Sequence, residues 1–206
     1  MRTTIALERE AIEEQARAAS DRLPIAPIAL MRAIGEALPE NAVVVDESIS
    51  SGTGLRRFLS AQDPQGFFGV RGGGIGWGLP AAIGVKLAVP DRPVFALVGD
   101  GSAMYANQAL WTAAHEDLAV TFVILNNRSY RILKQRMGAL AGAPSGQNYF
   151  FGLDITEPPI DFVGLAQSLG VAATPATTLP EVTKALREGL ASTAPRLVEV
   201  MLDTTI

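Results

Sequence analysis

Residues 94–102 read Val-Phe-Ala-Leu-Val-Gly-Asp-Gly-Ser, and this stretch decides the fold class. Its first five residues form a continuous apolar run, which is typical of a parallel strand buried on both faces. The run ends at two glycines that flank Asp100. A second apolar run, 120–125, ends at Asn126-Asn127. Two buried strands that end in polar residues predict a parallel sheet whose ligands bind beyond the carboxyl ends of the strands.

The flanking sequence repeats this alternation of apolar strands with helical segments. Strands are expected at 42–45, 67–70 and 197–202, and helices at 28–38, 51–60, 79–88, 108–115, 162–169 and 179–190. Strands that alternate with helices predict an α/β fold of three layers, in which helices cover both faces of a parallel sheet. Residues 138–159 are rich in Gly, Pro and Ser and are expected to form a long loop.

The two ends of the chain define the expected domain organisation. Residues 1–24 are strongly charged and have too few apolar side chains to bury a face, so we expect a linker or a helical extension. Residues 25–206 are expected to form one diphosphate-binding domain, which suits a chain of 206 residues. No targeting segment or membrane-length apolar run is visible, so a cytoplasmic protein is expected.

Composition excludes several classes of function. Hydrophobic residues make up 48% of the chain and charged residues 18%, so the chain can bury a core. The net charge of −4 gives no basic footprint of the kind that binds nucleic acid. With no cysteine and a single histidine, disulfides, thiolate metal sites and cysteine nucleophiles are excluded. So few reactive side chains favour chemistry that depends on a cofactor.

Asp100 and Asn127 are the candidate metal ligands. They lie 27 residues apart, which leaves room for one crossover helix between neighbouring parallel strands. Carboxylate and amide oxygens are hard ligands, and Mg²⁺ completes its octahedron with water and phosphate oxygens. A lone Gly-Asp-Gly or Asn-Asn is more often an ordinary turn. Together at two strand ends, with a glycine-rich segment at 72–78 upstream, they favour a site for a metal and a diphosphate.

At these residues the sequence resembles the thiamine diphosphate-dependent enzymes. Gly99-Asp100-Gly101-Ser102, followed by Asn126-Asn127, is similar to the cofactor-binding motif of that family. The lead-in segment 73–84 is similar as well. Residues 109–114 (Ala-Leu-Trp-Thr-Ala-Ala) and 46–48 (Asp-Glu-Ser) resemble the benzoylformate decarboxylase branch, with acetolactate synthase-like enzymes next. The similarity covers about residues 25–203 and implies the C-terminal, diphosphate-binding domain of such an enzyme.

The resemblance implies thiamine diphosphate and Mg²⁺ as cofactors and gives roles to the matching residues. The metal would be held by the side chains of Asp100 and Asn127 and by the backbone carbonyl of Ser129. The diphosphate would contact the backbone of Gly101 and the side chain of Ser102.

Four further residues are cofactor-binding candidates by the same resemblance. Ser50, just past the first strand, would reach the diphosphate. Gly73 would present its carbonyl to the aminopyrimidine amine, and Ile75 would be the apolar wedge between the two rings of the cofactor. For Ile75 the competing interpretation is a core residue that caps the sheet. Tyr130 is a candidate pocket residue, although a tyrosine that begins a helix is often only packing.

The reaction that the resemblance implies is attack of the thiazolium ylid on a 2-keto acid, followed by loss of carbon dioxide. The chain is thus expected to belong to a lyase of the 2-keto acid decarboxylase type, most like benzoylformate decarboxylase. An acetolactate synthase-like carboligase domain is one alternative. A non-catalytic module that binds the cofactor or assembles with a partner is another.

In this family a glutamate that activates the pyrimidine lies in a separate pyrimidine-binding domain of a partner subunit. A chain of 206 residues has no room for that domain, so the catalytic residues are expected outside it. Glu47 does not replace the activating glutamate, because its position matches a strand end of the diphosphate-binding domain itself. The chain is expected to be a fragment, a truncated reading frame or one subunit of a split enzyme. The complete enzyme is expected to be a homo-oligomer.

Other patterns compete weakly with this interpretation. Residues 76–81 satisfy the dinucleotide fingerprint G-x-G-x-x-A, but Pro80 lies inside it and no acidic residue follows at the required strand end. His115 ends a helix, where a histidine is commonly structural, so a hydrolase is not favoured. A basic cluster is expected to form a solvated helix face or an interface rather than an anion site; it comprises Arg128, Arg131, Lys134 and Arg136.

Overall fold

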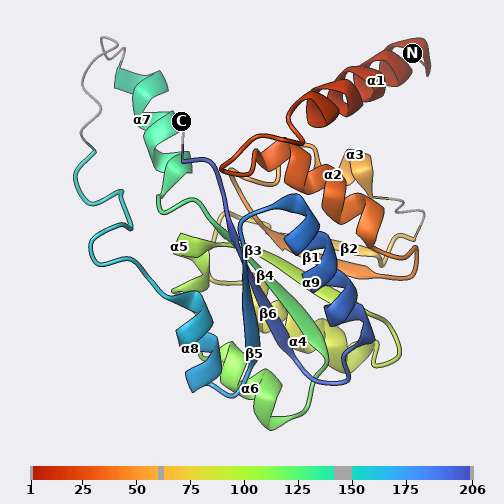
Figure 1. Cartoon of the computed structure of the whole chain (residues 1–206), viewed down its shortest axis with the longest axis vertical. Coiled ribbons are helices and arrows are strands. Elements are labelled where there is room, and N and C mark those ends of the chain that lie inside the picture. Colours follow the sequence, from red (N-terminus) through yellow and green to blue (C-terminus); the bar gives the residue numbers. More distant parts are fainter. Residues whose placement is uncertain (1, 60–62, 142–149, 205–206) are drawn as a thin grey trace.

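A parallel six-stranded sheet forms the centre of the molecule (Figure 1). The computed structural model describes residues 2–59, 63–141 and 150–204. The strand order is β2-β1-β3-β4-β6-β5, and every neighbouring pair is parallel. The strands are β1 (Val43–Glu47), β2 (Phe67–Gly69), β3 (Val94–Gly99), β4 (Val120–Asn126), β5 (Ala172–Ala176) and β6 (Arg196–Met201).

Helices connect the strands and cover both faces of the sheet. They are α1 (Arg2–Ala18), α2 (Pro27–Ala37), α3 (Leu55–Phe58), α4 (Gly78–Ala88), α5 (Asp100–Ala103), α6 (Ala109–His115), α7 (Arg131–Ala141), α8 (Phe162–Ser168) and α9 (Leu179–Ala191). Within the described ranges, no helix is both long enough and apolar enough to cross a membrane.

Alternating side chains of the central strands pack into two separate cores, which confirms the predicted three layers. Along β3, Val94 and Val98 pack with α4, α6 and α8 on one face. Phe95 and Leu97 pack with α2 and α9 on the other. Because neither face of β3 or β4 meets solvent, both strands are mainly apolar, as the sequence indicated.

One strand, β5, was not predicted from the sequence. It lies at the edge of the sheet and pairs only with β6. Its sequence, Ala-Ala-Thr-Pro-Ala, contains no large β-branched or aromatic residue and includes Pro175. Proline has no N–H for a sheet ladder and is confined to such edge positions. The strand is therefore determined by its pairing with β6 and not by its own propensity.

Two predicted segments differ in extent from the observed elements. The helix expected at 51–60 is reduced to α3, because Gly54 immediately before it has φ 87°, a left-handed conformation that a helix interior cannot contain. The loop expected at 138–159 begins later, since α7 continues to Ala141. Residues 142–149 of that expected loop lie outside the described part of the chain.

Helix α1 extends beyond the sheet at the end opposite to α6 (Figure 1). It contacts α2, where Arg32 donates to Glu13 at 2.7 Å. Residues 2–18 form this helix, while the assignment of residues 1–24 to a linker or helical extension stays a prediction. The boundary of the domain at residue 25 stays a prediction.

The topology places the carboxyl ends of three central strands side by side. After β1 the chain moves outward to β2, and then crosses to β3 on the other side of β1. Such a reversal leaves a crevice at the carboxyl ends of β1 and β3, which is the usual ligand position in open α/β sheets. Gly99 at the end of β3 is in register with Leu125 of β4, so Asp100 and Asn127 emerge at the same edge.

Candidate metal and cofactor site

Asp100 and Asn127 line one pocket at this edge, as the sequence predicted. Asp100 begins α5 directly after β3 and is 2% exposed, and Asn127 follows β4 and is 3% exposed. The N–H of Ser129 donates to Asp100 Oδ2 at 3.2 Å, which links the two strand ends. The pocket has a volume of about 110 Å³. Ser50, Ile75, Gly101, Ser102, Ser129 and Tyr130 also line it.

Asn127 carries a buried acceptor that nothing satisfies. Its Nδ2 donates to Ser51 Oγ at 3.4 Å, while Oδ1 has no hydrogen-bond partner. Among the described residues, the only other such buried side-chain atom is Arg131 Nε. A buried acceptor without a partner costs about 1–3 kcal/mol, which binding of a cation would offset. This atom therefore fits the amide ligand of a metal ion.

The carboxyl group of Asp100 is suited to the same metal ion. Burial raises the pKa of Asp100 to about 6, and hydrogen bonds from the N–H groups of Gly101, Ser129 and Arg128 limit the rise. At neutral pH the group is therefore mostly ionised. The described residues contain no cluster of three or more His, Cys, Asp or Glu side chains. The remaining coordination positions of a metal here would need water or ligand oxygens, which is how Mg²⁺ binds with phosphates.

The neighbouring Asn126 has a structural role instead. Its Nδ2 donates to Glu199 Oε1 of β6 at 2.7 Å, and its Oδ1 accepts from the N–H of Arg128 at 3.0 Å. Arg128 has φ 54°, a left-handed conformation that this hydrogen bond stabilises. Asn126 thus stabilises the turn that contains Asn127 and Arg128. Only one of the two asparagines is available to a ligand.

Tyr130 packs directly on the turn that follows β3. A Cβ added at Gly101 would lie 2.5 Å from the Tyr130 ring, so only glycine fits beneath it. Burial raises the pKa of Tyr130, and the nearby Tyr105 and Asp100 raise it further. Tyr130 therefore forms one wall of the pocket next to the candidate metal ligands.

Ile75 lies between two cavities, and the structure does not place it in the core. It is 37% exposed, lines the pocket that holds Asp100, and also lines a larger cavity of about 740 Å³ along β2. Gly73 has φ 74°, and a Cβ there would meet no atom within 4 Å. Gly73 lines neither cavity, so the structure does not bring it into the pocket with the other predicted residues.

The basic cluster is only partly solvated, which corrects the expectation of a solvated helix face. Arg131 and Lys134 are 6% and 8% exposed. Lys134 pairs with Asp154 and lies 5.8 Å from the centre of the Phe150 ring, and Arg131 donates to the backbone carbonyl of Asp203. The first turn of α7 lines the pocket, and its basic side chains contact Phe150, Asp154 and Asp203. Periodicity within α7 alone could not reveal those contacts.

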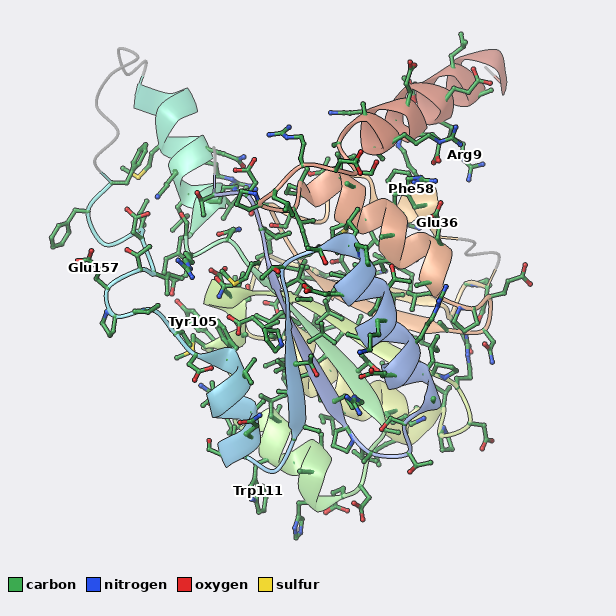
Figure 2. The ribbon with its side chains drawn as sticks, viewed as in Figure 1. Arg9, Glu36, Phe58, Tyr105, Trp111 and Glu157 are labelled. Atoms are coloured by element: carbon green, nitrogen blue, oxygen red, sulfur yellow. The ribbon has the colours of Figure 1, made fainter. Side chains whose placement is uncertain are left out.

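Three residues near the site were missed as contributors. Ser51 orients the amide of Asn127 by accepting its hydrogen bond. Tyr105 packs on Gly76, where an added Cβ would lie 2.5 Å from Tyr105 Cβ. Glu47 accepts hydrogen bonds from backbone N–H groups of the glycine-rich segment. Figure 2 shows Tyr105 near α5, well away from Trp111 on α6. The only sequence signal for Ser51 was its place in the serine-containing segment 48–51 that follows β1. Nothing local indicated the other two contacts.

A larger groove elsewhere on the molecule holds none of the predicted site residues. It has a volume of about 670 Å³ and lies between α1, α2 and α9. We place the site by its donor atoms and not by cavity size, because the smaller pocket alone contains the buried carboxylate and the unsatisfied amide oxygen.

Comparison with known proteins identifies the family. The family model described as "Thiamine pyrophosphate enzyme, C-terminal TPP binding domain" matches residues 50–200, which include both Asp100 and Asn127. The chain belongs to the thiamine pyrophosphate enzymes. This confirms the resemblance found in the sequence, and the cofactors of the family, thiamine diphosphate and Mg²⁺, agree with the donor set of the pocket.

Similar proteins come from two branches of the thiamine pyrophosphate enzymes. The chain is 43% identical over 176 residues to a putative acetolactate synthase large subunit of Mycobacterium tuberculosis, which covers 84% of this chain and 34% of that protein. It is 36% identical over 215 residues to a benzoylformate decarboxylase of Pseudomonas aeruginosa, which covers 97% of this chain and 39% of that protein. The chain thus spans little more than a third of the length of these curated relatives.

Solved structures of thiamine pyrophosphate enzymes share the fold. A thiamine diphosphate-dependent 4-hydroxybenzoylformate decarboxylase of Rhodococcus jostii RHA1 superposes with a TM-score of 0.83 at 36% identity, covering 90% of this chain and 34% of that one. A benzoylformate decarboxylase of Polynucleobacter necessarius gives a TM-score of 0.81 at 29% identity, covering 91% of this chain and 35% of that one. The predicted fold class is therefore confirmed.

Proposed function

We propose that this chain is the magnesium- and diphosphate-binding part of a 2-keto acid decarboxylase similar to benzoylformate decarboxylase. The observation that carries the proposal is the buried carboxylate of Asp100 beside the unsatisfied Oδ1 of Asn127, on segments within the matched family region. The benzoylformate and 4-hydroxybenzoylformate decarboxylases among its relatives support the substrate class.

In this proposal each residue of the pocket has a defined task. Asp100, Asn127 and the backbone carbonyl of Ser129 hold the metal ion. Ser102, the backbone of Gly101 and Ser50 hold the diphosphate. Ile75 separates the thiazolium and pyrimidine rings, Gly73 offers its carbonyl to the aminopyrimidine, and Tyr130 closes the wall.

The cofactor, when bound, supplies the electron sink for loss of carbon dioxide from a 2-keto acid. The residues of this chain contribute orientation. Asp100 and Asn127 hold the metal and through it the diphosphate, and the ring of Tyr130 packs against Gly101. Ile75 stands between the two cavities and restricts how a two-ring ligand can lie across them. The activating glutamate is expected in a pyrimidine-binding domain or subunit outside these residues.

An acetolactate synthase-like carboligase is the second candidate, because a protein named as such is 43% identical to this chain. A non-catalytic module that binds cofactor without turnover is the third. In each case we propose a homo-oligomer in the cytoplasm as the complete form, with the chain as one part of a larger enzyme. In this proposal, residues outside the pocket determine which substrate binds, so the same pocket serves all three candidate functions.

Isothermal titration calorimetry of the purified chain tests the proposed function. Thiamine diphosphate is titrated with Mg²⁺ present and with Mg²⁺ removed by EDTA, and thiamine without its diphosphate serves as the matched ligand control. We expect binding only when both the diphosphate and Mg²⁺ are present. Equal affinity with and without Mg²⁺ would show that Asp100 and Asn127 do not form the proposed metal site.

A further inference from the structure

Glu47 is a buried carboxylate that binds the glycine-rich segment by both of its oxygens. It ends β1 and is 0% exposed. Its Oε1 accepts from the N–H of Gly76 at 2.6 Å, and its Oε2 accepts from the N–H of Gly78. Burying a carboxylate without partners is costly, so the two N–H groups are what make this position tolerable for an acid. Hydrogen bonds to a charged acceptor are also stronger than neutral ones.

The structure at Gly78 shows that this contact is close-packed. A Cβ at Gly78 would lie 2.8 Å from Glu47 Oε2 and 2.9 Å from Glu47 Cβ. Glycine is therefore required for the carboxylate to reach the backbone. Gly78 is also the first residue of α4, so Glu47 satisfies an N–H that the helix itself leaves unpaired. The contact joins the end of β1 to the beginning of α4.

The segment before Gly76 has little else to hold it. Residues 71–75 are exposed, and a Cβ at Gly72, Gly73 or Gly74 would meet no atom within 4 Å. Tyr105 packs on Gly76 from one side, and Glu47 binds it from the other. Ile75 is bonded to Gly76, so the position of Ile75 between the two cavities follows from how Gly76 is held.

We propose that Glu47 is a positioning residue that holds Ile75 in place for the ring portion of the cofactor. This inference rests on the proposed function, because it uses Ile75 as a contact of the cofactor rings. Glu47 lines neither the metal pocket nor the cavity along β2, so it acts through the backbone of 76–78 and not by touching ligand. Its effect is confined to the rings, whereas the metal and diphosphate are held by Asp100 and Asn127.

Glu47→Gln separates this role from that of a space-filling core residue. Glutamine has nearly the same shape, but one of its two terminal groups is an NH₂ donor. That donor would face the N–H of Gly76 or Gly78, and one of the two hydrogen bonds is lost. Glu47→Asp keeps the charge and shortens the side chain by one methylene, so it serves as the second variant if Glu47→Gln does not fold.

Glu181→Gln is the matched control, because Glu181 also accepts from two backbone N–H groups, those of Thr177 and Thr178, at the start of α9.

The first measurement is amide hydrogen exchange on the full chain without cofactor, with glycines selectively labelled with ¹⁵N. We expect the amide of Gly76 or Gly78 to exchange at least about tenfold faster in Glu47→Gln than in the wild type, the minimum for loss of a hydrogen bond to a charged group. In Glu181→Gln both glycines should exchange at the wild-type rate. Unchanged exchange of both glycines in Glu47→Gln would overturn the inference.

The second measurement compares two ligands by calorimetry in the presence of Mg²⁺. Thiamine diphosphate should bind Glu47→Gln at least about tenfold more weakly than wild type, while inorganic diphosphate should bind both alike. Ile75→Ala should show the same split. Equal weakening of both ligands would indicate a general loss of structure and would overturn the positioning role. If the wild type binds neither ligand, the proposed function fails, and the exchange result alone then decides whether Glu47 holds the segment.

Discussion

At the residue scale, the surroundings of Asp100 and Asn127 are what make them candidate metal ligands. Asparagine pairs and Gly-Asp-Gly turns are common in proteins, and by themselves they indicate only a turn. Here the side chains of Ser51 and Glu199 take up the donor groups of Asn127 and Asn126, respectively. The Oδ1 of Asn127 is thereby left facing the pocket without a partner.

Asp100→Ala is expected to abolish Mg²⁺-dependent binding of thiamine diphosphate by the chain. The change removes the only buried carboxylate that lines the pocket in the described residues. Calorimetry at neutral pH checks this, with Asp91→Ala, a change in an exposed turn, as the control. Undiminished affinity in Asp100→Ala would contradict the assignment of the metal site.

Ile75→Ala is expected to weaken thiamine diphosphate binding with little effect on stability. Because Ile75 is 37% exposed, the truncation should change the free energy of unfolding by less than about 1 kcal/mol. Leu79→Ala is the contrasting variant: Leu79 is 1% exposed, so its truncation should cost about 2–5 kcal/mol. Urea denaturation measures both. A loss of several kcal/mol for Ile75→Ala, with normal binding, would favour a core role.

Glu199→Gln is expected to change how stability depends on pH. Burial raises the pKa of Glu199 above its ordinary value of 4.5, so the folded protein binds this proton more tightly than the unfolded chain. The favourable contribution of Glu199 is therefore fully present below pH 4.5 and is lost as pH rises through the raised pKa. Glutamine keeps the acceptor for Asn126 and does not titrate.

The measurement for Glu199→Gln is urea denaturation at several pH values from 4 to 8. The free energy of unfolding of wild type, minus that of the variant, should decrease as pH rises. A difference that stays constant or increases with pH would show that ionisation of Glu199 does not destabilise the folded protein.

At the scale of the element, α9 shows how a helix is begun by its sequence and held by its packing. Thr178 accepts from the N–H of Glu181, and Glu181 accepts from the N–H of Thr178, which is a complete capping box. Val182 and Leu186 then bury one side of the helix against the sheet. Both features are readable in the sequence, because they depend on residues three or four positions apart.

Thr178→Ala is expected to destabilise the protein by about 1 kcal/mol, since it removes the side-chain acceptor of this cap. Thermal or urea denaturation gives the change in free energy. Thr178→Ser, which keeps the hydroxyl, should restore most of the stability. Equal losses for the two variants would show that the threonine methyl, and not the cap, is responsible. Binding of thiamine diphosphate should be unaffected by either variant.

At the scale of the whole molecule, apolar side chains are buried on both faces of the sheet, while others remain exposed near the site. Several large apolar side chains near the carboxyl edge of the sheet are exposed: Ile49, Phe68, Ile75, Met104, Tyr105, Leu133 and Met137. Such a surface is typical of a region that another domain or subunit covers. It agrees with the proposal that a pyrimidine-binding domain or subunit completes the enzyme.

The purified chain is expected to fold cooperatively, to self-associate and to release no carbon dioxide from benzoylformate or pyruvate. The metal–diphosphate contacts would remain, but the cost of ordering the cofactor rings would be poorly offset, so binding should be weak. Analytical ultracentrifugation and a carbon dioxide assay with thiamine diphosphate and Mg²⁺ test this. Steady release above a control without protein would reveal an activating acid within the chain.

The sequence by itself determined the fold class, the family and the pair of metal-ligand candidates. The reason is that these features depend on local patterns: the mainly apolar runs 94–98 and 120–125, each followed closely by a residue that we propose as a metal ligand. Parallel strands align their carboxyl ends, so a local pattern repeated on two strands is enough to place two side chains together.

Only the tertiary structure decided which of the neighbouring residues face the site. The side chain of Asn126 is held away from the site by its hydrogen bond to Glu199, which lies 73 positions later in the chain. Glu47 accepts hydrogen bonds from the glycine-rich segment 29 and 31 positions later. The edge strand β5 exists because β6 offers it a partner. Such contacts join residues far apart in sequence, and their energy depends on burial, which no short stretch of sequence specifies.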